Sequence, residues 1–268
     1  MLRKIIFCAI LILVIACKNE HPQNIESNTE KPLVSFNYLQ SDSKTIIDRF
    51  ITEKGYNRET YSPQEFGYFL QQLPLKSIHE KVSYFDGSKK SKNDVYNSVI
   101  DLPIGTKDLH QCADATMRLR ADYLYQAKRY DEIAFNFISD SQPRYYTAFA
   151  KGDFSPEKYW KYLEYIFSYA NTASLKDQLK TVKYSDVKIG DLLIQKGNPY
   201  GHAVIVVDLI TNGHSKKVLL AQSYMPAQEL QILDNPSSQD KSPWYDVKEG
   251  DIITPEWKFT SDDWKTWE

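Results

Sequence analysis

The amino-acid sequence predicts an α+β fold, and two observations carry that prediction. Between residues 43 and 180 several runs of apolar side chains recur at helical spacing, some with a cap residue before them. Residues 190–224 instead contain three successive strand patterns separated by short turns. We therefore expect a short antiparallel sheet packed on a helix, with an added helical region at the N-terminal end.

The first segment of the chain predicts export. Arg3 and Lys4 precede an apolar run over residues 5–15, which is too short to span a bilayer comfortably and is typical of a signal peptide. The run ends in VIAC, which resembles the lipobox of bacterial lipoproteins. This resemblance implies that residues 1–16 are removed and that Cys17 carries a lipid. An ordinary signal peptide or an N-terminal anchor helix is the alternative.

The rest of the chain divides into a tether and a domain. Residues 17–40 are polar, contain Pro22 and Pro32, and offer little to bury. Residues 41–268 form the expected single α+β domain, with a helical part over 41–80 and the core over 81–268. The lipid would place this domain in the cell envelope, on the periplasmic or surface side of a bacterial membrane.

The helical part contains two predicted helices. Residues 43–51 place Ile46 and Phe50 on one face, and residues 62–74 begin with a capping-box pattern of Ser62 and Glu65. Strands are expected at 81–87 and 96–105, separated by a lysine-rich loop.

Cys112 lies within the next predicted helix, over residues 106–126, with Thr106 or Asp108 as its cap. This position is near the positive end of the helix dipole, which lowers the pKa of a thiol. Asp114 and Arg118 are four residues apart and are expected to pair.

Further elements follow in order. A strand is predicted at 132–138, a helix at 155–170 capped by Ser155, and a short helix at 175–180 capped by Ser174. The three strands are 190–195, 202–210 and 217–224. His202 begins the middle strand and Gln222 lies near the end of the next, where residues of an antiparallel pair can be neighbours.

The cysteine count makes Cys112 unusual. The sequence contains Cys8, Cys17 and Cys112, of which the first leaves with the signal and the second is blocked by lipid. Cys112 then has no intramolecular partner in a compartment where thiols tend to be oxidised. It is either a buried small hydrophobe or a nucleophile.

These residues resemble the papain-like superfamily, and in particular the NlpC-type cell-wall peptidases. A helix with Cys near its start, then GDL, a strand opening with His and a strand bearing a polar residue form the shared pattern. The resemblance implies that Cys112 is the nucleophile, His202 its base and Gln222 the residue that orients the base. It implies no metal and no organic cofactor. The chain departs from the pattern in having QCAD where those enzymes usually have Asp-Cys-Ser-Gly, and in a longer gap between Cys and His.

A second resemblance covers nearly the whole mature chain. The segments that carry it are DLHQCADATMRLRADYLY, GDLLIQKGNPYGHAVIVVD, LLAQSYMPAQELQIL, SPWY and TPEWKF. They resemble an uncharacterised bacterial family known only as a domain of unknown function. This resemblance implies no established activity.

The sequence therefore predicts a lipid-anchored cysteine hydrolase that cleaves an amide in peptidoglycan peptides or in a protein. The alternative is a non-catalytic binding or scaffold lipoprotein with the same fold. The formal net charge of −2, which becomes about −4 once Arg3 and Lys4 leave, indicates no nucleic-acid partner. A metal site of His110, Cys112 and Asp114 is disfavoured, because side chains two residues apart on a helix diverge. Further residues expected to line the site are Gln111, Asp114, Arg118, Ser223, Tyr224 and Gln228.

The lipobox resemblance generates a testable prediction. Replacing Cys17 with Ala should release the protein from membranes or leave it unprocessed, because the residue that carries the lipid is gone. Membrane fractionation and intact-mass measurement of both proteins check this. A wild-type mature protein without lipid would contradict it.

Overall fold

A computed structural model describes residues 37–92 and 94–267, all within one compact unit. The predicted signal peptide, the predicted lipid-attachment residue Cys17 and the part of the predicted tether up to residue 36 lie outside the described residues. Within the described ranges, no helix is long and apolar enough to cross a membrane.

The described residues form one large antiparallel sheet of nine strands. Its strands are β1 (Asn57–Arg58), β2 (Tyr96–Val99), β5 (Lys180–Thr181), β6 (Leu192–Gln195), β7 (His202–Thr211), β8 (Lys216–Gln222), β9 (Gln231–Leu233), β10 (Tyr245–Val247) and β13 (Trp264–Thr266). The main order is β2-β9-β8-β7-β6-β13-β5, while β1 pairs with β7 and β10 with β8. The predicted short sheet is thus the centre of a larger one.

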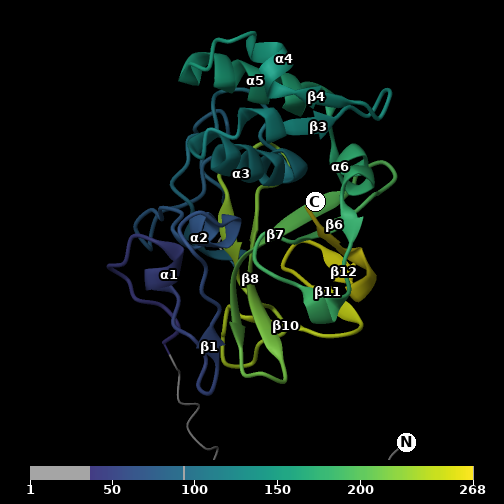
Figure 1. Ribbon diagram of the computed structural model, residues 1–268. Helices are drawn as coiled ribbons and strands as arrows, with labels where there is room; N and C mark the ends of the chain where they lie inside the picture. The colour runs from purple at the N-terminus through teal and green to yellow at the C-terminus, as the bar shows by residue number, and fades with distance from the viewer. Residues whose placement is uncertain (1–36, 93, 268) are drawn as a thin grey trace, which may run out of the picture. The chain divides into compact units, whose positions relative to one another are not determined.

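Two small hairpins and six helices complete the described part. The hairpins join β3 (Ala134–Asn136) to β4 (Pro143–Tyr145) and β11 (Asp251–Ile253) to β12 (Lys258–Thr260). The helices are α1 (Ile46–Arg49), α2 (Phe66–Gln71), α3 (Cys112–Gln126), α4 (Tyr146–Ala150), α5 (Pro156–Tyr169) and α6 (Thr172–Gln178). Helix α3 packs on β7, and α4 and α5 lie beyond α3 from the sheet (Figure 1). The α+β prediction is confirmed at this level.

The central strands follow from their composition. All but the last residue of β7 are buried, and the strand is an almost continuous apolar run rich in Val and Ile, as expected for a strand covered on both faces. β7 pairs with β6 from Ile205 opposite Leu192 to His202 opposite Gln195. It pairs with β8 from Ile205 opposite Ala221 to Thr211 opposite Lys216. The predicted strands at 190–195, 202–210 and 217–224 are therefore confirmed within two residues at each end.

Helix α3 begins later than predicted. Its first residue is Cys112, so the predicted start at 106 and the predicted caps Thr106 and Asp108 are wrong. Gln111 is the N-cap, and its backbone N–H donates to Asp114 Oδ2 at 3.1 Å. The Asp108 carboxylate instead accepts from the backbone N–H of Ala227 at 2.6 Å. This contact with a loop far away in the sequence keeps residues 106–111 from extending the helix.

Other boundaries differ for local reasons. Residues 81–87 form no strand and contribute only isolated bridges, Ser83 to Lys89 and Tyr84 to Gln228. Asn171 rather than Ser174 caps α6, because the Asn171 side chain accepts from the N–H of Ala173 and of Ser174. Ser155 caps α5 as predicted, through a 3.3 Å hydrogen bond from the Lys158 N–H.

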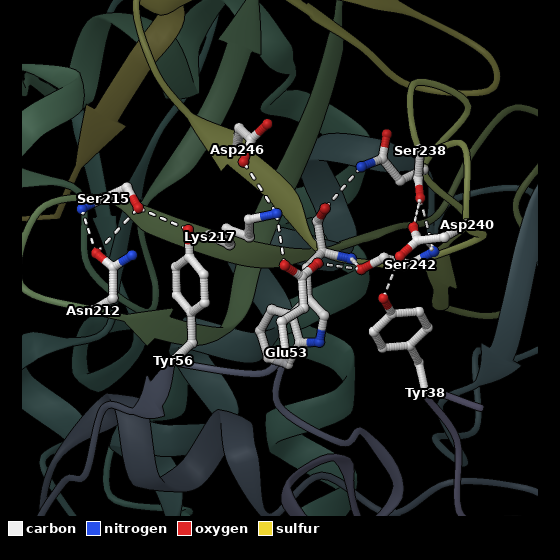
Figure 2. A network of polar contacts seen from close by, with 12 residues as sticks. Tyr38, Glu53, Tyr56, Asn212, Ser215, Lys217, Ser238, Asp240, Ser242 and Asp246 are labelled. Atoms are coloured by element: carbon white, nitrogen blue, oxygen red, sulfur yellow. Dashed lines mark hydrogen bonds and ion pairs between the residues drawn. The ribbon is translucent and has the colours of Figure 1, made fainter. Parts of the chain in front are cut away.

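A polar network joins the start of the described chain to the loop before β10. Lys217 pairs with Glu53 at 2.7 Å and with Asp246 at 3.3 Å, and the Ser242 hydroxyl donates to Glu53 (Figure 2). The Tyr38 hydroxyl donates to Asp240 in the same network. These contacts fix the N-terminal segment of the domain to the far end of the sheet.

A buried ion pair interrupts the apolar run of β7. Asp208 is fully buried, and its carboxylate lies 2.9 Å from Arg58 Nε and accepts from Gln71 Nε2 at 2.8 Å. The pair joins β1 and α2 to the centre of β7. Burial raises the pKa of Asp208 to about 6, an effect that Arg58 and Gln71 partly oppose.

Replacing Asp208 with Ala should lower the free energy of unfolding by about 3–5 kcal/mol, because the Arg58 guanidinium, on a side chain only 16% exposed, loses its counter-charge. Asp246 is half-exposed and Lys217 keeps Glu53 without it, so Asp246→Ala should cost less than about 1 kcal/mol. Urea unfolding measures both variants. Equal losses in the two would contradict the importance of the buried pair.

Candidate functional site

A cleft of about 240 Å³ opens at the N-terminal end of α3. One wall is the junction of α5 and α6, and the other is the loop between β6 and β7. Cys112 lies among the lining residues, which also include Gln111, Ala113, Asp114, Phe167, Ala170, Asn171, Thr172, Ala173, Lys196, Gly197, Pro199, Tyr200, Gly201 and Met225.

Cys112 is the first residue of α3 and is 5% exposed. Its sulfur lies 4.0 Å from the hydroxyl oxygen of Thr172. Burial, and then the neighbouring Asp114, raise the pKa of Cys112 to about 11, while hydrogen bonds from the Ala203 backbone and from Thr172 act in the opposite direction. The prediction of a lowered thiol pKa is therefore wrong, because desolvation outweighs the helix dipole at this depth.

Asp114 explains part of that shift. The side chain is buried two residues after Cys112, with Oδ2 bound to the Gln111 N–H and Oδ1 without a hydrogen-bond partner among the described residues. Burial raises the pKa of Asp114 well above its usual range. Asp114 lines the cleft as predicted, but it does not pair with Arg118.

His202 and Gln222 form the expected contact. The ring Nε2 of His202 and Oε1 of Gln222 are 2.8 Å apart, and both side chains are buried at the adjacent ends of β7 and β8. Burial lowers the pKa of His202 to about 4, although the hydrogen bond to Gln222 opposes the shift and the charge of Lys90 adds to it. The imidazole is therefore neutral at neutral pH.

Aromatic side chains enclose the His202 ring. The ring centroids of Tyr224, Trp257 and Phe259 lie 4.9, 5.3 and 5.9 Å from that of His202. The preceding residue must be small, because a Cβ on Gly201 would lie 2.2 Å from the carbonyl oxygen of Gln195. The turn into β7 and the aromatic shell together fix where the ring lies.

Cys112 and His202 are neighbours through the backbone. The Ala203 backbone, next to His202 in β7, lies close enough to the Cys112 thiol to oppose the rise in its pKa. Within the described residues, however, the hydrogen bond of the sulfur to a side chain is to Thr172, and none joins it to the His202 ring. His202 also lies behind the cleft and does not line it. The expected direct contact between the thiol and the ring is thus not shown.

The remaining predicted residues divide between the site and its surroundings. Gln111 lines the cleft, and Tyr224 packs beside His202. Gln228 is buried and its Oε1 accepts from Lys90 Nζ at 3.1 Å. The Ser223 hydroxyl lies 2.8 Å from the His110 carbonyl oxygen and 2.7 Å from that of Gln228, so it fixes the backbone beneath the site and does not line the cleft.

The predicted pairing of Arg118 with Asp114 is wrong, because Arg118 pairs with Asp122. Its Nε donates to Asp122 at 3.2 Å, another nitrogen donates to the Pro103 carbonyl, and its guanidinium lies 5.2 Å from the Trp160 ring. Arg118 follows Asp114 by one helical turn, but its guanidinium is directed to Asp122, the Pro103 carbonyl and Trp160 instead. Arg118 therefore stabilises the packing of α5 on α3 and is absent from the lining of the cleft.

Sequence reasoning missed Glu256 and Lys90. Glu256 Oε2 accepts from Gln222 Nε2 at 2.7 Å and from Lys90 Nζ at 2.9 Å. Lys90 comes from the lysine-rich loop, where neighbouring lysines give no sign that this side chain is buried. Glu256 belongs to the TPEW segment, which was noted only for its family resemblance.

The described residues contain no group of three or more His, Cys, Asp and Glu side chains placed to hold a metal ion. His110 is buried against Phe167, with ring centroids 5.9 Å apart, and burial lowers its pKa to about 3. Neither of its ring nitrogens has a hydrogen-bond partner within the described part of the chain.

The fold and the site define an α+β protein in which a helix-borne thiol lies in a cleft beside a histidine–glutamine pair. The chain belongs to the family described as domain of unknown function (4846), whose pattern matches residues 46–154 and 146–266. This confirms the predicted membership of an uncharacterised domain family. Neither a curated protein nor a solved structure matches the chain.

The raised thiol pKa generates a test. Between pH 6 and 9, alkylation of Cys112 by iodoacetamide should accelerate about tenfold per pH unit without a plateau, because the thiolate fraction keeps rising up to the pKa. Peptide mass spectrometry follows the modified residue. The same protein in urea should level off near the free-thiol pKa of about 8.5. A plateau below pH 7 in the folded protein would contradict the burial effect.

Proposed function

We propose that this protein is a cysteine hydrolase that cleaves an amide bond in a peptide of the cell envelope. The observation that carries the proposal is the 2.8 Å hydrogen bond between His202 and Gln222, one residue along β7 from the backbone that contacts the Cys112 sulfur. A nucleophile, a base and a group that orients the base are the parts that thiol hydrolysis needs.

The first step is attack on the amide. Nε2 of His202 is already hydrogen-bonded to Gln222, so Nδ1 is the ring nitrogen that can accept the thiol proton. The neutral ring accepts the thiol proton while the sulfur forms a bond to the amide carbonyl carbon. A small movement of the ring or of Cys112 on substrate binding must bring the two together, since no hydrogen bond joins them in the described structure.

The second step releases the amine. The backbone N–H of Cys112, at the first position of α3, has no intrahelical acceptor and can stabilise the oxyanion. The C–N bond breaks, and the imidazolium gives its proton to the leaving nitrogen. Water then attacks the thioester as His202 accepts a proton, and the products are a carboxylic acid and the restored thiol.

The cleft and the expected location support the substrate class. A volume of about 240 Å³ suits a short peptide segment rather than a folded domain. Tyr200, 63% exposed at the rim, offers an aromatic surface. The resemblance to NlpC-type peptidases and the lipobox resemblance at Cys17 favour peptidoglycan peptides, reached from a membrane anchor.

One observation favours a non-catalytic binding protein instead. The thiol is almost fully buried and its pKa is raised, as for a cysteine that only packs. In that case the cleft binds a peptide without cleaving it. Turnover distinguishes the two functions.

The processed protein should cleave soluble peptidoglycan fragments, with the mass of the products rising in total by one water. Cys112→Ser should abolish cleavage, and His202→Ala should lower kcat by about 10²- to 10⁴-fold. Because the base acts unprotonated, kcat/KM should rise as pH passes about 4 and then stay level through neutral pH.

The matched control for the histidine is His214→Ala, in the exposed turn between β7 and β8, which should leave turnover unchanged. Circular dichroism checks that each variant is folded. Binding of the fragments without any cleavage would favour the non-catalytic alternative, and full turnover by Cys112→Ser would reject Cys112 as the nucleophile.

A further inference from the structure

Gln222, Glu256 and Lys90, from separate parts of the chain, form a series of hydrogen bonds that begins at His202. Gln222 of β8 donates through Nε2 to Glu256, which lies in the turn between β11 and β12. Lys90, from the loop before β2, donates to the same oxygen, Oε2 of Glu256. Lys90 is 3% exposed and the Glu256 side chain 14% exposed, so the pair is largely shielded from solvent.

The chemistry of Glu256 fixes the orientation of Gln222. A primary amide could present either its oxygen or its NH₂ group to the imidazole. An ionised carboxylate only accepts hydrogen bonds, so the group that faces Glu256 must be the NH₂. The oxygen of Gln222 is thereby directed at His202 Nε2.

The orientation of Gln222 in turn fixes the proton on the ring. An amide oxygen only accepts, so Nε2 must carry the hydrogen in the 2.8 Å contact. A neutral imidazole has a single N–H, which leaves the lone pair on Nδ1. Nδ1 is the nitrogen that faces neither Gln222 nor Glu256.

Lys90 supplies the counter-charge of Glu256. Its ammonium group lies 2.9 Å from the carboxylate and 3.1 Å from Gln228 Oε1. Burial lowers the pKa of Lys90, and Glu256 opposes that shift. Each charge is buried only because the other is present.

We propose that Glu256, paired with Lys90, is a positioning residue that sets the tautomer of His202 through the amide of Gln222. The effect on hydrolysis rests on the proposed function, whereas the effect on the tautomer does not. Glu256 touches no reacting atom in this mechanism, and it acts through Gln222 alone.

The turn that carries Glu256 does not need the side chain for its own shape. Thr254 N–H donates to the Trp257 carbonyl at 2.8 Å, and Trp257 N–H donates to the Thr254 hydroxyl at 3.1 Å. These two bonds close the turn between β11 and β12. A substitution at 256 is therefore directed at the Gln222 contact rather than at the backbone.

The test uses the full chain with ¹⁵N-labelled histidine, and His202→Ala assigns the His202 signals. Wild type should show a protonated Nε2 and an unprotonated Nδ1. Glu256→Gln should keep this pattern, because the amide oxygen of the new side chain can accept from both Gln222 Nε2 and Lys90 Nζ. In Glu256→Met the ammonium of Lys90 should attract the Gln222 oxygen, turn the amide over and shift the ring to the Nδ1–H tautomer.

Turnover of peptidoglycan fragments gives the second measurement. Glu256→Met should lower kcat by roughly 10- to 100-fold with KM unchanged, and Glu256→Gln should restore most of it. The matched control is Glu53→Met, which breaks a Lys–Glu pair in the network of Figure 2 whose glutamate side chain is as exposed as that of Glu256, 15% against 14%. It should change neither the tautomer nor kcat.

If Glu256→Met fails to fold, Lys90→Met/Glu256→Met removes both charges and should give a mixture of the two tautomers. A wild-type tautomer in folded Glu256→Met or in the folded double variant, or the same shift in Glu53→Met, would overturn the proposal. Absence of turnover in every protein, with the tautomer still shifted in Glu256→Met, would reject the hydrolase and leave the positioning role supported.

Discussion

The contact between the first turn of α3 and the first residues of β7 determines the rest of the site. It places a thiol against the backbone of Ala203, and the next side chain along the strand is the imidazole of His202. The cleft walls, the aromatic residues around the ring and the polar pairs behind it all lie around this contact. Because helix and strand are far apart in the sequence, the site exists only in the folded chain.

Burial rather than charge sets the properties of the groups there. Desolvation is the largest cause of the raised pKa of Cys112 and of the lowered pKa of His202. Both shifts favour neutral forms, so the resting pair is a thiol and an imidazole rather than a thiolate and an imidazolium. A substrate that displaces water and supplies a carbonyl would meet a base that is free to accept a proton.

The sequence predicted the elements whose signals are local. Strands β6 to β8 follow from apolar runs and an Asn212-Gly213 turn, and α5 follows from Ser155 and Pro156 at its start. The start of α3 was misplaced because Asp108 is used by Ala227, a partner that no local pattern reveals. The strands after residue 230 are three residues long, which is too short for a periodicity to show.

The same distinction holds for the site. His202 and Gln222 could be paired from the sequence because their strands are consecutive and antiparallel. Glu256 and Lys90 could not be paired from the sequence, because the loops that carry them meet only in the folded protein. The burial of Cys112 also depends on Thr172 and the α5–α6 junction. Sequence patterns predict helices in this part of the chain but not that they pack against Cys112.

The depth of Cys112 has a consequence for the lifetime of the protein. Peroxides and disulfides react with the thiolate, and a sulfur that stays protonated and shielded forms sulfenic acid or mixed disulfides slowly. The closed floor of the cleft therefore protects the Cys112 sulfur from oxidation by burial alone.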